Sequence, residues 1–231
     1  MPEKSFKQVA IKNVSDWESL PEEDKILVSN SMAICLFYLG DLVRAREVSY
    51  LYSHHKENQD KEGVNRRTRI SSHFLAGLYA SLAQEQTKAE KHWQQLVWYR
   101  RDFFPENQAQ KPKTAYIWIY EAYALMKLRR YEEVEQPAKI GFEGLLAGMG
   151  IYSNPRQNER EYGLANVMLT LSSYMLQPTE LGRQQAQQAL ITYKEENVKY
   201  SRRGYAIIFD LQFSYPDVFI PVLPGPDPEL D

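Results

Sequence analysis

Cysteine is nearly absent from this sequence. Cys35 is the only one among 231 residues, so no disulfide can form within the chain. A single thiol suits a reducing compartment, and we therefore expect the protein to be cytoplasmic. The apolar neighbours of Cys35 in "SMAICLFYLG" predict a small buried side chain, and a reactive thiol is the less favoured alternative.

Long apolar runs and an excess of one charge are also lacking. The longest uncharged run, residues 162–179, contains asparagine, glutamine, two serines and a proline, which favours a buried helix over a membrane span. The N-terminus "MPEKSFKQVAIKN" has no apolar stretch and does not read as a secretory signal. The formal net charge is −2, so no global positive field predicts a nucleic-acid or membrane partner.

The common motifs of catalysis and metal binding are missing as well. The sequence has no HExxH, no Cys-x-x-Cys and no phosphate-binding loop. His54 and His55 could hold a metal only with ligands from elsewhere. Paired arginines would bind phosphate or a carboxylate if they converged, but their places at helix ends and turns favour surface charge. These pairs are Arg66–Arg67, Arg100–Arg101, Arg129–Arg130 and Arg202–Arg203. We therefore expect a non-catalytic protein with no metal and no cofactor.

A repeated helical pattern is what the sequence does contain. In "YLGDLVRAREV" (38–48) a long apolar run stops at Gly40–Asp41 and restarts at once as a mixed apolar and charged run. Gly40 can end a helix in the left-handed conformation, and Asp41 can cap the next helix. The stretch thus predicts two helices folded back on each other.

This hairpin recurs at a nearly constant spacing. The turns fall at Gly40, Gln84, Arg129 and Gln177, at intervals of 44, 45 and 48 residues. Five residues after each turn stands a small or compact side chain, as close helix contact requires: Ala45, Ala89, Val134 and Gly182. Strand patterns are scarce, so we predict an all-α fold, an α–α superhelix (a right-handed solenoid) of about four helix-turn-helix pairs.

Two local features are specific to single pairs. Thr87-x-x-Glu90 predicts a capping box at the start of the second helix of the second pair. Pro137 either kinks the second helix of the third pair or lies at its true start, near Gln136. In "FDLQFS" (209–214) apolar and polar residues alternate, but a final helix over about 200–213 fits as well.

The turns resemble the tetratricopeptide family, whose pattern runs from a glycine through an aromatic or leucine to an alanine. "GDLVRA" (40–45) matches this pattern well, and "RRYEEV" (129–134) keeps the aromatic. Trp118-x-x-Glu121-Ala122 is similar to the family's Trp-x-x-Leu-Gly. The resemblance covers roughly residues 24–197. The period is about ten residues longer than the ordinary repeat, which leaves HEAT-like and other α–α repeats open.

The chain divides into three parts on this basis. Residues 1–20 form an N-terminal extension with a short helix, and residues 21–199 form the repeat domain. Residues 200–231 form a capping segment and a proline-rich tail that covers the last helix face or docks onto a partner or the protein's own groove. The expected pairs span about 21–56, 66–104, 113–147 and 158–197.

The resemblance implies that the first helix of each pair lines a concave groove. Tyrosines there would offer rigid apolar area and a hydrogen-bonding tip, as peptide-binding surfaces do. Burial in the core with satisfied hydroxyls is an equally open alternative. The groove residues implied are Asn30, Phe74, Tyr116, Tyr120, Tyr123 and Lys127.

Function is therefore predicted at the level of a class. We expect a protein–protein interaction module that binds a peptide or helical segment of another protein in its groove. The alternative is a small-molecule-sensing or catalytic helical protein with a closed pocket. A homodimer through an exposed end pair is a further open alternative.

Overall fold

A computed structural model describes residues 6–21, 24–25, 28–57, 64–104, 114–148, 155–197 and 202–219. Within these ranges the chain is helical and has no strand, so the all-α prediction is confirmed for them. The helices are α1 (Phe6–Glu18), α3 (Ser29–Tyr38), α4 (Leu42–Glu57), α5 (Val64–Leu82), α6 (Gln86–Phe103), α7 (Ala115–Lys127), the 3-10 turn η3 (Tyr131–Glu133), α8 (Glu135–Gly148), α9 (Pro155–Leu176), α10 (Glu180–Asn197) and α11 (Arg202–Ser214).

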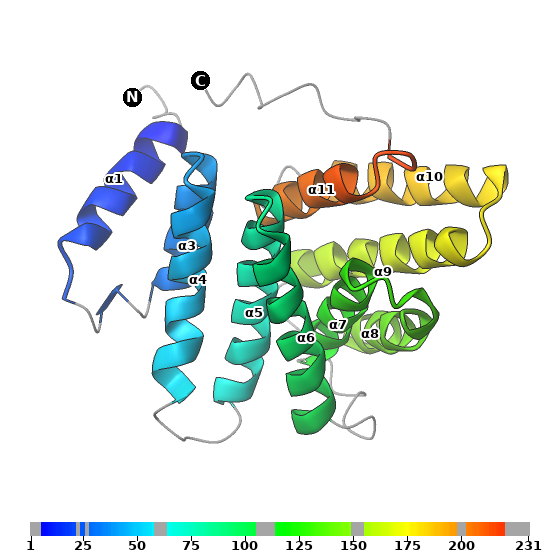
Figure 1. Cartoon of the computed structure of the whole chain (residues 1–231), viewed down its shortest axis with the longest axis horizontal. Helices are drawn as coiled ribbons and strands as arrows, with labels where there is room; N and C mark the ends of the chain where they lie inside the picture. The colour runs from blue at the N-terminus through cyan, green and yellow to red at the C-terminus, as the bar shows by residue number, and fades with distance from the viewer. Residues whose placement is uncertain are drawn as a thin grey trace.

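Consecutive helices pack against each other from α3 to α10 (Figure 1). The first helices of successive pairs also touch, since α3 contacts α5, α5 contacts α7 and α7 contacts α9. Helix α11 departs from this order, because it returns to α5 and also packs on α10. Helices α3 to α6 run alongside one another in Figure 1, and α9, α10 and α11 lie across them.

Three of the predicted turns share one backbone geometry. Gly40, Gln84 and Arg129 all have a positive φ, of 80°, 60° and 58°. At each turn the next residue's amide reaches back five residues: Asp41 to the Leu36 carbonyl, Glu85 to that of Ala80 and Arg130 to that of Leu125, each at 2.9 Å. This is the Schellman ending of a helix, and it satisfies carbonyls that the helix leaves without an amide partner.

The helix starts confirm some expectations and correct others. The Arg44 amide donates to Asp41 Oδ1 at 3.1 Å, so Asp41 caps α4 as predicted. The capping box at Thr87 is wrong, because α6 begins one residue earlier, at Gln86, with Glu85 as its cap residue and no side-chain cap bond. Pro137 lies in the first turn of α8, where its missing amide hydrogen costs no helical bond.

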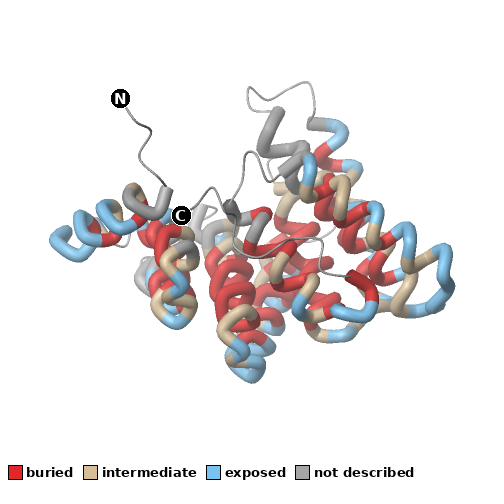
Figure 2. Tube along the Cα trace, turned by 90° about the horizontal axis from the view of Figure 1, so that it is seen from above, coloured by how far each residue is buried: buried red, intermediate tan, exposed pale blue. Residues whose placement is uncertain are grey.

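The core runs through the middle of the molecule, where Figure 2 shows buried segments in red. Ala45, Ala89 and Val134 are fully buried, as their positions after the turns predict, whereas Gly182 is half-buried. Cys35 is 6% exposed, which confirms its expected burial. In the part of the chain that the structure describes, no helix has both the length and the hydropathy needed to cross a membrane.

The segment "FDLQFS" (209–214), whose alternating pattern left a strand or a helix open, forms the end of helix α11. The segment is helical, and Ala206, Ile207, Ile208 and Leu211 are each at most 1% exposed. The helix packs on α5 and α10, and it is therefore part of the core.

Candidate protein-interaction site

The aromatic side chains predicted for the groove form a buried cluster. Phe74 of α5 stacks on Tyr120 of α7 with ring centroids 4.0 Å apart, and it meets Tyr123 edge-on at 5.2 Å. Phe74 and Tyr123 have no exposed surface and Tyr120 has 1%. A partner cannot touch these rings in this structure, so the geometry matches the alternative of core packing.

Lys127 is also buried, and its charge is compensated within the chain. Its Nζ donates to both carboxylate oxygens of Asp210 and to Ser81 Oγ, each at 2.9 Å, and also to Ser214. The side chains of Lys127 and Asp210 are 4% and 0% exposed. Tyr123 donates its hydroxyl to the same carboxylate. Burial, followed by the charge of Asp210, raises the pKa of Tyr123 well above its ordinary value.

These contacts correct the predicted groove. The side of α5 and α7 that was expected to hold a partner is covered by α11 of the same chain, through Asp210. Tyr116 is half-buried and meets Tyr120 edge-on at 5.3 Å. The side chain of Asn30 lies outside the described residues. Asp210 was not predicted, although an acid inside an apolar helix face is a signal for a buried partner such as Lys127.

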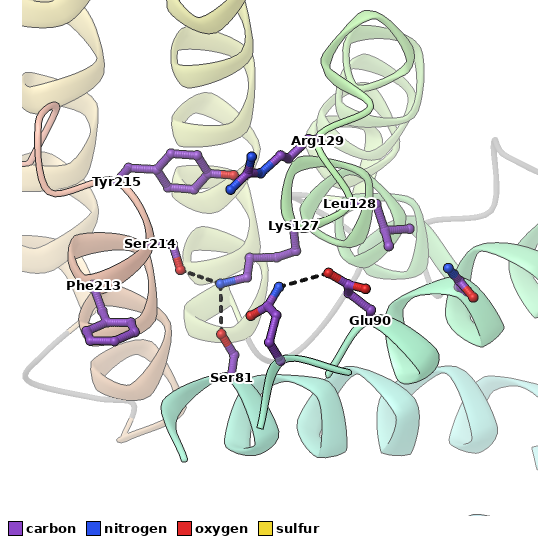
Figure 3. Close-up of a pocket in the computed structure, with 10 residues that line it drawn as sticks. Ser81, Glu90, Lys127, Leu128, Arg129, Phe213, Ser214 and Tyr215 are labelled. Carbon is purple, nitrogen blue, oxygen red and sulfur yellow. Dashed lines mark hydrogen bonds between the residues drawn. The ribbon is translucent and has the colours of Figure 1, made fainter. Parts of the chain in front are cut away.

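Two adjoining cavities lie beside this ion pair, at the C-terminal ends of α5 and α7. Figure 3 shows the first of them. They have volumes of about 430 and 410 Å³ and share Arg129, Ser214 and Tyr215. We call them together the Arg129 groove. The first is lined further by Ser81, Gln86, Glu90, Gln94, Lys127, Leu128 and Phe213, and the second by Tyr131, Tyr174, Met175, Pro178, Pro216, Asp217 and Val218.

Arg129 stands at the junction of the two cavities, and its side chain is exposed. No ion pair joins it to another described residue, whereas its neighbour Arg130 pairs with Glu133. Tyr215 beside it is held by a 2.7 Å bond from its hydroxyl to the Met126 carbonyl, and burial raises the pKa of that hydroxyl well above its ordinary value. The groove thus offers an uncompensated guanidinium between rigid aromatic walls.

A third cavity, of about 580 Å³, lies where α6 meets α7 and α8. Arg100 and Arg101 converge there on the buried Glu121, with N–O distances of 2.7 and 2.8 Å. The Arg100 guanidinium also lies 3.9 Å from the centroid of the Trp118 ring. Since Arg101 pairs in addition with Glu133, this arginine pair is used inside the chain and leaves little charge for a ligand.

The histidines show no sign of a metal site in the part of the chain where side chains are placed. His73 and His92 bring their Nδ1 atoms to 3.3 Å, and His73 stacks on Tyr99 at 5.3 Å. Burial, and then the charges of Arg46 and Lys91, lower the pKa of His92 to about 4. Among the described residues no three potential metal ligands gather. The side chains of His54 and His55 lie outside the described residues.

Comparisons with known proteins find nothing similar to this chain. No family model, no curated protein and no solved structure matches it. The tetratricopeptide resemblance therefore rests on the sequence motifs alone, and the functional argument rests on the geometry described above.

Proposed function

We propose that the protein is a non-catalytic interaction module that binds a peptide or helical segment of another protein in the Arg129 groove. In this proposal its helical pairs follow one another as in a right-handed superhelix. The tetratricopeptide-like turns then lie at equivalent positions between the two helices of each pair. The contacts among α3, α5, α7 and α9 support this arrangement. The single thiol supports a cytoplasmic location.

The observation that carries this proposal is the unpaired Arg129 in a groove with aromatic walls. Arginine and tyrosine dominate the energetics of many protein interfaces, because both offer large contact area and directional bonds. A guanidinium binds a carboxylate through two parallel hydrogen bonds. The partner that fits carries an acidic side chain beside apolar ones, which would rest on Tyr131, Tyr174 and Phe213.

The turn geometry provides a matched pair of variants for the test. Arg129→Gly removes the guanidinium at a positive φ, and Gln84→Gly makes the same backbone change at the equivalent turn of the preceding pair. Gln84 lines neither cavity of the groove. Proteins captured from the native cell by the full chain are identified, purified and titrated calorimetrically against wild type and both variants.

We expect Arg129→Gly to weaken the captured partner's binding about tenfold or more, since the loss of a charged hydrogen bond is worth roughly 1.5–3 kcal/mol. Gln84→Gly should bind as wild type does. Equal affinity for all three proteins would contradict the placement of the site. A large thermal shift with a metabolite or nucleotide, combined with no captured protein, would instead favour a small-molecule pocket.

A further inference from the structure

An exposed aromatic cluster lies on α6, apart from the Arg129 groove. Trp98 is 56% exposed, although a tryptophan usually hides most of its surface. Its ring meets Tyr99 edge-on at 4.8 Å and Phe103 at 6.1 Å, and Tyr99 and Phe103 stack at 5.5 Å. Neither cavity of the groove includes any of these rings.

Two arginines of α5 lie over the same rings. The Arg66 guanidinium is 4.7 Å from the centroid of Phe103, and that of Arg69 is 5.7 Å from the centroid of Tyr99. Neither arginine has an ion-pair partner among the described residues, and the Nε–H of Arg69 is buried without an acceptor. We call Trp98, Tyr99, Phe103, Arg66 and Arg69 the aromatic–arginine patch.

This arrangement prepares the two cations for an anionic group. A guanidinium that lies on a ring has already lost much of its side-chain freedom, so a carboxylate binds it at a smaller entropic cost. Trp98 beside the cations offers a large apolar anchor.

We infer that the aromatic–arginine patch is a second docking surface, for an acidic segment of another protein that carries a large apolar side chain. The carboxylates of that segment pair with Arg66 and Arg69, and the apolar side chain covers Trp98. Charge complementarity carries this choice, because the patch itself is cationic in a chain whose net charge is −2.

The same chemistry favours an acidic peptide over a nucleic acid. A nucleic-acid surface needs a stripe of several cations that follows the phosphates. Here the guanidiniums placed over the rings are those of Arg66 and Arg69. Two cations can pair with the carboxylates of a short acidic segment, but they do not make a stripe along a phosphate backbone.

The test uses the full chain and a random twelve-residue peptide library displayed on phage. Peptides selected on wild type are sequenced, and the most enriched one is synthesised with a fluorescent label and titrated by anisotropy. Trp98→Ala and the double variant Arg66→Glu/Arg69→Glu probe the patch. Leu181→Ala on α10 is the control, since Leu181 is 65% exposed and distant along the chain. Circular dichroism checks that each variant keeps its helices.

We expect selected peptides rich in Asp or Glu next to a large apolar residue. Their binding should fall at least tenfold with Trp98→Ala and with the charge reversal, and should not change with Leu181→Ala. A selection without acidic enrichment, or equal binding by wild type and Trp98→Ala, overturns the inference. So does Trp98-dependent binding of a labelled twelve-nucleotide oligouridylate in place of peptides, or a Trp98-dependent dimer in analytical ultracentrifugation. The Arg129→Gly substitution should leave this peptide's binding unchanged, so the experiment tests the patch independently of the Arg129 groove.

Discussion

Asp210 and Lys127 form an ion pair that is almost fully removed from solvent, with Tyr123 and two serines completing its hydrogen bonds. Such pairs are weak evidence of net stabilisation, because both charges lose their hydration. Removal of one partner is a different matter, since it leaves the other charge buried without compensation. The pair therefore fixes where α11 sits more than it adds to the free energy of unfolding.

We expect Asp210→Asn to lower the free energy of unfolding by about 3–5 kcal/mol, the usual cost of an uncompensated buried charge. The double variant Asp210→Leu/Lys127→Met should lose less than the sum of its two single substitutions, because it removes both charges together. Urea denaturation of wild type, Asp210→Leu, Lys127→Met and the double variant measures this coupling, and Asp210→Asn is measured in the same way. Strictly additive losses would show that the two groups do not interact.

His92 predicts how stability depends on pH. Its pKa in the fold is about 4, against 6.5 in the unfolded chain, so below pH 6.5 the unfolded chain binds a proton that the folded protein does not. The contribution of His92 to the free energy of unfolding should be fully present above about pH 6.5 and should decrease as the pH falls towards 4. Below pH 4 this group should cause no further loss. The pKa shift corresponds to roughly 3 kcal/mol of unfolding free energy. We expect a loss of about 2 kcal/mol, because the ring keeps some contact with water.

The control for this prediction is His92→Gln, which cannot titrate. Urea unfolding of wild type and variant at pH 7, 6, 5 and 4 separates the histidine from the carboxylates, since these titrate in both proteins. The stability difference between the two should shift in the variant's favour by about 2 kcal/mol between pH 7 and pH 4. A constant difference over this range would show that the ring is not desolvated as the structure has it.

At the scale of elements, the turns were predictable and the groove was not. Gly40 announces a Schellman turn because only glycine adopts a positive φ without strain. The turns at Gln84 and Arg129 were predicted from the ends of the helical patterns on either side, although neither residue favours a positive φ. The hydroxyl partner of the buried Tyr123 could not be read from α5 and α7 alone, because it is Asp210 of α11, 87 residues further along the chain.

The two positive-φ side chains give the turns a measurable strain. A non-glycine residue in the left-handed region costs about 1–2 kcal/mol, and substitution by glycine removes this strain. Part of the resulting stabilisation is lost again, because glycine has a greater conformational entropy in the unfolded chain. We therefore expect Gln84→Gly and Arg129→Gly each to raise the unfolding free energy by up to about 1 kcal/mol, or the melting temperature by roughly 2–4 °C. Calorimetric melting of both variants measures it, and destabilisation of either would mean that its side chain contributes more than its strain costs.

The start of α6 shows why the Thr87-x-x-Glu90 motif misled. A capping box requires its threonine to lie just outside the helix, but the Schellman turn at Gln84 and Glu85 places the helix start before Thr87. The geometry of the preceding turn decided the boundary, and the local motif did not. At Pro137 the sequence left two alternatives, a kinked helix or a helix start near Gln136. The structure has the second, because α8 begins at Glu135 and Pro137 lies in its first turn.

At the scale of the molecule, the distinctive feature is that the described helices form an array of successive contacts to which α11 adds contacts with α5 and α7, far back along the chain. Every pair from α3 to α10 touches its sequence neighbours, whereas α11 returns to α5. Ile207, Ile208 and Leu211 of α11 are buried, and burial of three such side chains is worth on the order of 5 kcal/mol. A surface of α5 is therefore covered by a later helix of the same chain.

This arrangement predicts that α11 can be supplied separately. A chain that ends at residue 201 should melt at a lower temperature and bind the dye ANS, because the apolar side of α5 and α7 is then exposed. A synthetic peptide of residues 202–219 should restore the melting temperature and displace the dye in a saturable titration. The same peptide with Asp210→Asn should bind at least tenfold more weakly, because Lys127 then loses its carboxylate. If the truncated chain melts as the full chain does, α11 does not stabilise the other helices. If both peptides restore the melting temperature equally, the aspartate does not contribute to the binding of α11.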